Sequence, residues 1–456
     1  MNPKPPTNSD RHFLLWGDIP FWTAMVFWSF MASTKTPWFD IESVPVSLKD
    51  IVNIGLGGFY WLVPAITKRS LKFNPKPWHC HLPLATISLL IYAAVSVEWS
   101  RMQPIDARAM LYTLLLTAGA FLMGYYLIQK RSLESIRPFL WQVTVLVAAV
   151  GLLYSAGSFF SLGLGTENTY ESESFGVQRV RGPLFVSTTG FFILIPALAF
   201  AIQELLKNPS QYLFKVLIIF SLTLTLVGLG SRSALLLLAV FFLLVILSFK
   251  NKKQAITAFI LIAVVTAAAG LIFFSRAKTD RLKSLEDTTR SDTYSTSFAI
   301  IYNRDDNINF FGSGYGSYWP WYIPDIQGAR ETNQYFNLVW NPYGNLLYHP
   351  HSTLLLLIVE LGVPGLLYFL LLWIILVFLL LRNLGEAEFP VLNCGMFASA
   401  FSMFFDFFLF RSAQVSLIWW LFLFGTLALN YGNNKHCLLL PSDTAGNTEI
   451  NTEIKP

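Results

Sequence analysis

Charged side chains are scarce in this chain, making up 13% of its 456 residues, against about 25% in an ordinary soluble domain. Hydrophobic residues reach 54% and aromatic residues 16%. A chain of this kind has too few polar groups to cover a folded surface, which excludes a water-soluble globular protein. Apolar stretches long enough to cross a bilayer recur along most of the sequence. They predict a membrane protein with many spans.

Short strands of alternating polarity, which are typical of outer-membrane barrels, are also lacking. Backbone groups inside lipid must find hydrogen-bond partners within the segment, so the apolar stretches are expected to be helices. We therefore predict an all-α polytopic membrane protein with about twelve transmembrane helices. The expected spans are 13–33, 47–66, 82–98, 107–129, 138–160, 184–203, 213–230, 233–249, 255–274, 352–381, 391–410 and 413–430.

The chain divides into four expected parts. Residues 1–274 hold the first nine helices, and 275–350 form a large outward loop. Residues 351–432 hold the last three helices, and 433–456 form a polar tail that is expected to be disordered. The tenth span is too long for one straight helix, so Pro364-Gly365 should kink or break it. A helical lead-in from His351 would then precede the main span, which runs from Leu366 onward.

Basic residues gather in alternate connections, at 68–76, 130–137 and 250–253. The positive-inside rule places these connections and both termini in the cytoplasm. The connections that would face outward, away from the cytoplasm, are 34–46, 99–106, 162–183, 228–232 and 275–350. Asp18 and Pro20 interrupt the first apolar run, so the first span is expected to remain as an anchor rather than to be cleaved.

Cysteine is rare, and Cys80, Cys394 and Cys437 all fall at expected cytoplasmic positions. This excludes a framework of extracytoplasmic disulfides. The net charge of +5 follows from the positive-inside bias and does not indicate a nucleic-acid partner. Residues 312–316 resemble a phosphate loop only in their glycines, because the lysine of a P-loop is missing. They predict turns, and we expect neither a metal nor a cofactor.

The outward loop 275–350 is much longer than a connector requires, and it contains fifteen aromatic residues. Long loops of this kind are usually functional or folded insertions. Aromatic rings can stack on the apolar faces of sugars. They can equally form the core of a small folded cap, and both interpretations stay open.

Arginine occurs at the outer face, where the positive-inside rule disfavours it. Arg179 and Arg181 precede the sixth span, and Arg232 follows the tight turn Gly228–Ser231. A guanidinium fork suits a phosphate or a carboxylate. For the first pair, nearby glutamates are an alternative partner, whereas no acidic residue lies near Arg232 in the sequence.

His351 stands where the long polar loop meets an apolar helix. It could cap that helix at the interface, or it could act on a substrate that lies half in the membrane. Glu360 follows nine residues later and would face the opposite side of the helix, about 13 Å further along it. A direct His–Glu pair is therefore not expected. Glu360 is expected to fasten the helix to the bundle through a neighbouring polar group.

The run His351-Ser352, nine further residues, and then Gly362-Val363-Pro364-Gly365 resembles the signature of the O-antigen ligase and polymerase superfamily. These bacterial membrane glycosyltransferases use glycans linked to undecaprenyl pyrophosphate. Two further elements are similar. Arg232 and Leu236 resemble the family's Arg-x-x-x-Leu element, and Arg290 followed by 311–316 resembles the loop ahead of the histidine. The resemblance covers about 175–410.

The resemblance implies a glycosyltransferase of the bacterial inner membrane that acts at its periplasmic face. The donor would be an undecaprenyl-pyrophosphate-linked glycan, and the acceptor a lipid A-core sugar. Arg232, supported by Arg290 and by Arg179 or Arg181, would hold the pyrophosphate, and His351 would be the general base. Transfer would invert the anomeric carbon and need no metal, and Glu360, Gly362 and Gly365 would be structural.

Three alternatives remain open. A polymerase would pass the chain to a lipid-linked repeat unit, and Arg179 with Gly190 has the Arg-(ten residues)-Gly spacing described for polymerases. The large loop has no such pair, so the sequence favours a ligase. A transferase that modifies protein is a related possibility. A transporter is the competing class, but its coupling charges would be expected near the bilayer midplane.

Overall fold

The computed structural model describes the greater part of the helical regions. Residues described are 18–26, 39–41, 44–46, 51–52, 72–73, 81–100, 104–160, 180, 190–248, 306–318, 339–340, 346–347, 351–384, 387–406, 408–431 and 438–439, with scattered positions in 55–58 and 260–302. The statements below refer to these residues.

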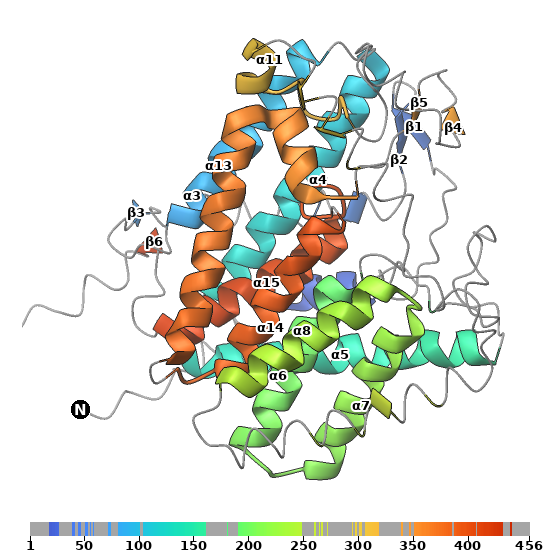
Figure 1. Ribbon diagram of the computed structural model, residues 1–456, viewed down its shortest axis with the longest axis vertical. Coiled ribbons are helices and arrows are strands. Elements are labelled where there is room, and N and C mark those ends of the chain that lie inside the picture. The colour runs from blue at the N-terminus through green and yellow to red at the C-terminus, as the bar shows by residue number, and fades with distance from the viewer. Residues whose placement is uncertain are drawn as a thin grey trace, which may run out of the picture.

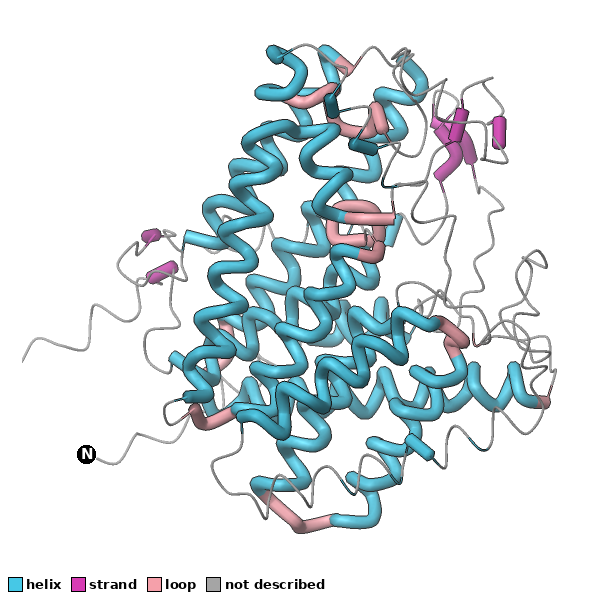
Figure 2. Tube along the Cα trace, in the orientation of Figure 1, coloured by secondary structure: helices cyan, strands magenta, loops and turns pink. Residues whose placement is uncertain are grey.

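Helices dominate the described structure (Figures 1 and 2). The main ones are α3 (His81–Ser96), α4 (Pro104–Gln129), α5 (Leu133–Phe159), α6 (Gly190–Lys207), α7 (Tyr212–Gly228), α8 (Arg232–Ser248), α13 (Thr353–Leu381), α14 (Pro390–Phe401) and α15 (Ala413–Tyr431). Short helices are α11 (Asp306–Phe311) and the 3-10 turns η2 (Val97–Trp99), η6 (Arg382–Leu384) and η7 (Ser402–Phe404).

Strands occur only as three small antiparallel pairs in the described residues. They are β1 (Phe39–Ile41) with β2 (Val44–Val46), β3 (Lys72–Phe73) with β6 (Leu438–Leu439), and β4 (Val339–Trp340) with β5 (Leu346–Leu347). None is longer than three residues, so none contributes to the core.

Six described helices are long and apolar enough to cross a membrane: those in 81–99, 110–129, 133–159, 190–207, 353–381 and 413–431. Three shorter apolar helices cover Tyr212–Gly228, Ser233–Ser248 and Pro390–Phe404. These nine segments coincide with nine of the expected spans, and the helical membrane class is confirmed. The count of twelve stays a prediction, because the spans 13–33, 47–66 and 255–274 lie largely outside the described residues.

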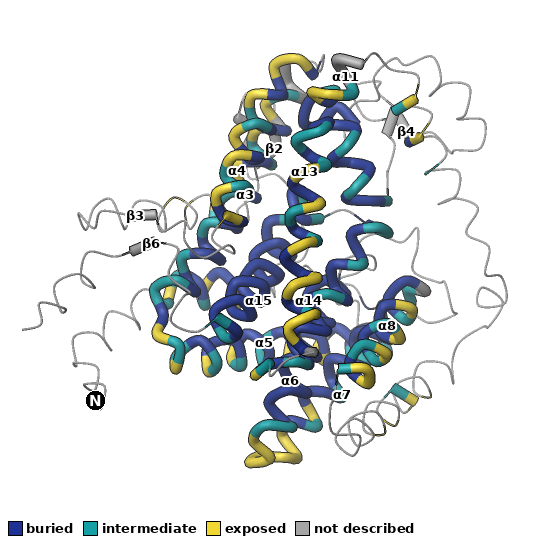
Figure 3. Tube along the Cα trace, turned by 60° about the vertical axis from the view of Figure 1, so that its left-hand side comes forward, coloured by how far each residue is buried: buried dark blue, intermediate teal, exposed yellow. Residues whose placement is uncertain are grey.

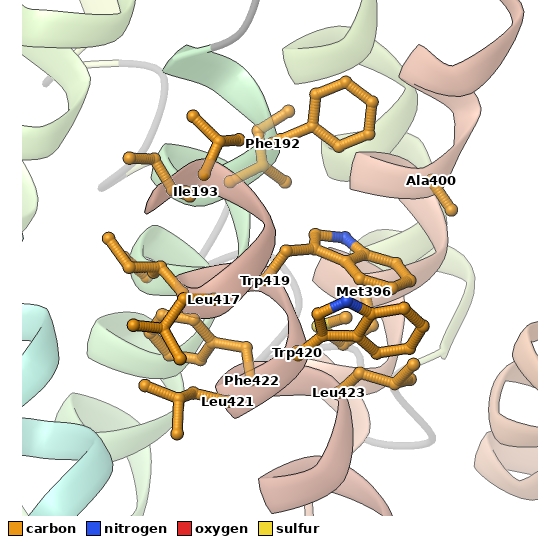
Figure 4. Packing of buried hydrophobic residues seen from close by; sticks show 14 of the residues in the cluster. Phe192, Ile193, Met396, Ala400, Leu417, Trp419, Trp420, Leu421, Phe422 and Leu423 are labelled. Carbon is orange, nitrogen blue, oxygen red and sulfur yellow. The ribbon is translucent and has the colours of Figure 1, made fainter. Parts of the chain in front are cut away.

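The core of the bundle is built around α15, which is buried along nearly its whole length (Figure 3). It packs against α4, α5 and α6. A helix that is apolar all round belongs inside a bundle rather than at its surface. Its Trp419 and Trp420 side chains lie beside Met396 of α14 (Figure 4), and the Trp419 indole donates to the Ser399 hydroxyl at 3.1 Å.

Ion pairs mark one end of the bundle. Arg137, at the start of α5, pairs with Glu204 near the end of α6 through bonds of 2.5 and 2.9 Å. Lys207 pairs with Glu388, just before α14, at 2.8 Å. This end therefore holds the basic connection 130–137, and we call it the basic end.

The opposite end holds the connections α3–α4 and α7–α8. Gly190, the first residue of α6, lies against Leu229, and the Val180 amide donates to the Gly228 carbonyl at 2.8 Å. The start of α6 thus lies beside the end of α7, so these two helices run antiparallel, as consecutive membrane spans must. The assignment of this opposite end to the periplasm stays a prediction of the positive-inside rule.

Helix α13 is broken at Gly362, which has φ 61° and ψ −140°. A Cβ placed on Gly365 would lie only 2.4 Å from the carbonyl oxygen of Leu357, although eight residues of straight helix cover about 12 Å. The first arm (353–361) and the second arm (363–381) therefore fold back against each other (Figure 1). The break expected in this span is present, two residues before Pro364, because glycine alone takes this backbone conformation readily.

Replacing Gly362 should destabilise the fold at this break. In Gly362→Ala, a Cβ would meet the Phe310 carbonyl oxygen at 2.3 Å and the Gly312 nitrogen at 2.5 Å, and the backbone strain alone costs about 1–3 kcal/mol. We expect a lower midpoint of thermal unfolding in detergent. Gly55→Ala is the control, because nothing lies within 4 Å of its Cβ position. Equal midpoints for the two variants would contradict the prediction.

Candidate functional site

A glycine-rich segment, the glycine loop (312–318), docks at the break in α13. Gly312, Gly314 and Gly316 have φ values of 80°, 97° and 87°, which form the turns expected from the sequence. A Cβ on Gly312 would lie 2.2 Å from the Glu360 carbonyl oxygen. The close approach of two backbones therefore requires glycine here.

The glycine loop supplies the hydrogen bonds that the break removes from the first arm. In an unbroken helix, the Glu360 carbonyl would accept from residue 364, but Pro364 has no N–H to donate. The Gly314 amide donates to this carbonyl at 2.9 Å, and the Ser313 amide donates to the Val359 carbonyl at 2.9 Å. The loop thereby caps the end of the first arm, because its amides pair with carbonyl groups that the break leaves without helical partners.

A buried ion pair reinforces the same contact. The Nη2 atom of Arg411 donates to both carboxylate oxygens of Glu360, at 2.7 and 2.6 Å, and the two side chains are 7% and 2% exposed. The Arg411 guanidinium also lies over the Tyr315 ring, 4.0 Å from its centroid. The Tyr318 amide donates to Glu360 at 3.3 Å. Glu360 thus fastens the first arm to the connection before α15.

Two aromatic residues of the glycine loop are core residues rather than free platforms. Tyr315 and Tyr318 are buried, and the Tyr315 hydroxyl donates to the Phe410 carbonyl at 2.7 Å. Burial raises the pKa of Tyr315 to about 12, so this phenol keeps its proton at physiological pH. For these two residues the folded-cap interpretation holds. The other aromatics expected for sugar stacking lie mainly outside the described residues.

His351 lies immediately before the first arm and is partly exposed. The next residue, Ser352, caps the helix, because its hydroxyl accepts from the Leu355 amide at 3.3 Å. His351 itself has φ 46°, a left-handed conformation that costs about 1–3 kcal/mol for a residue other than glycine. The arm is held in place by Thr353, whose amide and hydroxyl donate to the Asp406 carbonyl at 3.0 and 2.8 Å.

The packing of α8 against α14 relates Arg232 to His351. The Ser248 hydroxyl, at the end of α8, contacts the Cys394 thiol near the start of α14 at 3.1 Å, and the two helices lie side by side. Since the helices are antiparallel, Arg232 at the start of α8 lies toward the other end of α14. That end continues through η7 to Asp406, beside the residue that follows His351-Ser352. Both backbones are therefore at the end opposite the basic end.

The remaining arginines expected at the site are not described. Arg179, Arg181 and Arg290 lie outside the described residues, as does the side chain of Arg232. Val180 is described and buried, and its bond to Gly228 brings this point of the chain to the turn that precedes α8.

Sequence reasoning missed Arg411. It lies between the last two helices, at the end opposite the basic end, so it is an arginine where the positive-inside rule disfavours one. The same signal drew attention to Arg232. Applied to every outward connection, it would have found Arg411 as well, but not its pairing with Glu360.

Residues 216–370 match a family model described as O-antigen ligase. The resemblance to the O-antigen ligase family is thereby confirmed. The match covers about a third of the chain and extends from α7 into the second arm of α13. It includes Arg232, His351 and Glu360. Comparison with curated proteins and with solved structures found no match.

Breaking the buried ion pair should cost far more than breaking an exposed one. Glu360→Ala leaves the Arg411 guanidinium buried without its carboxylate, and such losses cost about 3–5 kcal/mol. We expect a large fall in the midpoint of thermal unfolding. Glu388→Ala is the matched control, because this carboxylate is 67% exposed in its pair with Lys207 and exposed pairs contribute little. Equal effects of the two substitutions would show that the Glu360 pair is not the fastening.

Proposed function

We propose that this protein is an O-antigen ligase-type glycosyltransferase. It transfers a glycan from undecaprenyl pyrophosphate to a sugar hydroxyl of the lipid A-core, at the periplasmic face of the bacterial inner membrane. The observation that carries the proposal is the family match over 216–370, within which the start of α8 and the start of α13 lie at the same end of the helix bundle.

The proposed topology has twelve spans, with both termini in the cytoplasm. The basic end is then cytoplasmic, and the end with the glycine loop is periplasmic. A donor with a polyprenyl tail would keep the tail in the bilayer and present its diphosphate at the outer rim, level with the helix starts that carry Arg232 and His351.

In the proposed reaction His351 is the general base. Its imidazole accepts the proton of the acceptor hydroxyl as that oxygen forms a bond to the anomeric carbon. The bond between this carbon and the donor phosphate oxygen breaks, and undecaprenyl pyrophosphate leaves. Attack from the face opposite the leaving group inverts the configuration. The left-handed backbone at His351 supports the assignment, because local strain is often kept at functional positions.

Arg232 is proposed to stabilise the leaving pyrophosphate, supported by Arg290 and by Arg179 or Arg181. Guanidinium groups neutralise the charge that develops on the phosphate oxygens as the glycosidic bond breaks. Arg232 is also the first residue of α8, where the helix dipole favours an anion. These positive charges would serve in place of a metal ion.

A polymerase is the second candidate, on the observation that Arg179 and Gly190 have the spacing described for polymerases. The structure offers another reason for glycine at this position. A Cβ on Gly190 would lie 2.9 Å from the Leu229 side chain, so the close packing of α6 against the α7–α8 turn accounts for it. We therefore keep the ligase as the proposal.

Replacing the imidazole should abolish transfer without unfolding the protein. Asparagine tolerates the left-handed conformation but cannot act as a base. We expect His351→Asn to lower the rate of donor-dependent glycan transfer by about 10²–10⁴-fold, with an unchanged unfolding midpoint, in assays of purified protein with lipid-linked donor. A folded variant that transferred glycan at the wild-type rate would remove the base assignment.

Removing the guanidinium of Arg232 should raise the free energy of the transition state. We expect Arg232→Gln to lower kcat/KM for the donor by about 10²–10³-fold, and Arg232→Lys to restore little, because a single ammonium lacks the planar fork. Arg382→Gln is the control, since this exposed arginine lies at the basic end of the bundle. Equal losses in the two glutamine variants would argue against a role for Arg232 in donor binding.

The cellular test separates the candidate functions. Deletion in the native host should remove long-chain lipopolysaccharide from a gel, while polymer accumulates on the carrier lipid. A core that bears a single repeat unit would instead indicate a polymerase. Substrate accumulation in vesicles that contain no lipid-linked donor would indicate a transporter.

A further inference from the structure

Residues 402–406, which we call the η7 segment, follow directly after α14. The amides of Phe405 and Asp406 both donate to the Ser402 carbonyl at 2.9 Å, so the segment forms a closed turn. Ser402, Met403 and Asp406 are buried. The backbone of this turn is therefore fixed by its own hydrogen bonds and by the packing around it.

Both arms of α13 contact the η7 segment. From the first arm, the amide and the hydroxyl of Thr353 donate to the Asp406 carbonyl at 3.0 and 2.8 Å. From the second arm, the rings of Phe369 and Trp373 pack against the Phe404 ring, with centroids 5.6 and 5.1 Å apart. The two arms are thus held to one short piece of backbone.

The outward loop 275–350 contacts the same segment through Tyr294. The Tyr294 hydroxyl donates to the Phe404 carbonyl at 2.5 Å, and this carbonyl is two residues before the one that Thr353 uses. The two partners are 110 residues apart in the sequence, so only the tertiary fold brings them together. Two side-chain hydroxyls, one from the loop and one from the first arm, therefore donate to nearby carbonyls of a single turn.

The bonds of Thr353 act close to His351. Thr353 is the first residue of α13, and the only residue between it and His351 is Ser352, which caps the helix. His351 has φ 46°, and such a strained conformation persists only where the surrounding structure enforces it. Two donors on one carbonyl restrain the start of the arm more closely than the amide alone would.

We propose that the hydroxyls of Thr353 and Tyr294 position His351 for glycan transfer, because they fix the first arm and the outward loop to the η7 segment. The inference rests on the proposed function, in which His351 is the base. Both hydroxyls act through His351, so they belong to positioning residues and not to catalytic ones. A base must lie within hydrogen-bond reach of the proton that it accepts, so a displaced imidazole slows the chemical step and leaves donor binding unchanged.

The test for Thr353 removes its hydroxyl and keeps its shape. Thr353→Val should lower kcat for donor-dependent transfer by the purified protein about 10- to 100-fold, with an unchanged KM for the donor. Thr353→Ser should restore most of the rate. Thr426→Val is the matched control, because Thr426 is 0% exposed against 1% for Thr353 and its hydroxyl also donates to a backbone carbonyl, at 2.6 Å within α15. Equal losses of kcat in the two valine variants would overturn the positioning role.

Tyr294→Phe tests the η7 segment from the side of the outward loop, and it decides the matter if Thr353→Val does not fold. We expect kcat to fall about three- to tenfold, as for the loss of one hydrogen bond. Tyr368→Phe is the control, because it removes a hydroxyl that is hydrogen-bonded to Thr86 at 3.0 Å, and it should keep the wild-type kcat. Tyr294→Phe with the wild-type kcat would remove Tyr294 from the proposal.

The double variant Thr353→Val, Tyr294→Phe tests whether the two hydroxyls act through one segment. Its loss of kcat should be smaller than the product of the two single losses, because residues that share a partner are not additive. A loss equal to that product would show that the two hydroxyls act independently, which contradicts a common role of the η7 segment.

A measurement on His351 itself does not depend on transfer. The chain has six histidines, so selective isotope labelling of histidine gives few imidazole signals in NMR spectra, and His351→Asn identifies the signal of His351. Thr353→Val should shift or broaden this signal, while Thr353→Ser and Thr426→Val should keep it as in the wild type. An unchanged signal in Thr353→Val would overturn the inference even if transfer were demonstrated.

Failure of the proposed function would look different. If His351→Asn transferred glycan at the wild-type rate, the base assignment and the catalytic part of the inference would both fail. A shifted His351 signal in Thr353→Val would then still show that Thr353 holds His351 in place.

Discussion

This end of the molecule depends on one constraint: the carbonyl oxygen of Glu360 needs a hydrogen-bond donor from outside its own helix. Pro364 cannot donate to it, and inside a membrane bundle an unpaired carbonyl finds little water. The Gly314 amide fills the place at 2.9 Å. To reach that position the glycine loop must touch the backbone of α13, which explains glycine at both 312 and 362. One missing N–H thus determines the docking of the loop.

The ion pair between Glu360 and Arg411 lies where the glycine loop contacts the backbone of α13. Taking two charges out of water is costly, and a buried pair is tolerated only where further hydrogen bonds complete it. Here the Tyr318 amide donates a further hydrogen bond to Glu360, and the Arg411 guanidinium lies over the Tyr315 ring in a cation–π contact. The first arm, the glycine loop and the connection before α15 are thereby held together, and His351 lies immediately before the first arm. A proposed base gains from such a rigid support, because its position relative to substrate is then held by packing.

The sequence predicted nine of the observed helices, because bilayer thickness imposes a length that composition reveals. It also predicted a break in α13 and placed it at Pro364-Gly365, whereas the break lies at Gly362. Gly362, Pro364 and Gly365 all disfavour a regular helix, so composition alone does not distinguish between these positions. The reversal of the two arms was not predictable, because it depends on the contact of Gly365 with Leu357. The partner of Glu360 was equally hidden: Arg411 is 51 residues away, and only tertiary packing brings the two together.

The topology of the membrane spans predicts only part of the relative position of Arg232 and His351. Alternation of spans puts the start of α8 and the start of α13 at one face, but leaves open whether they lie on the same side of the bundle. Two contacts indicate that they do lie on the same side. Ser248 of α8 contacts Cys394 of α14, and Thr353 of α13 bonds to Asp406, which follows α14, so that α8 and α13 both border α14. A diphosphate at the membrane rim would need cations and a base along one such border, which is why the proposed chemistry depends on α14 as much as on the signature helix.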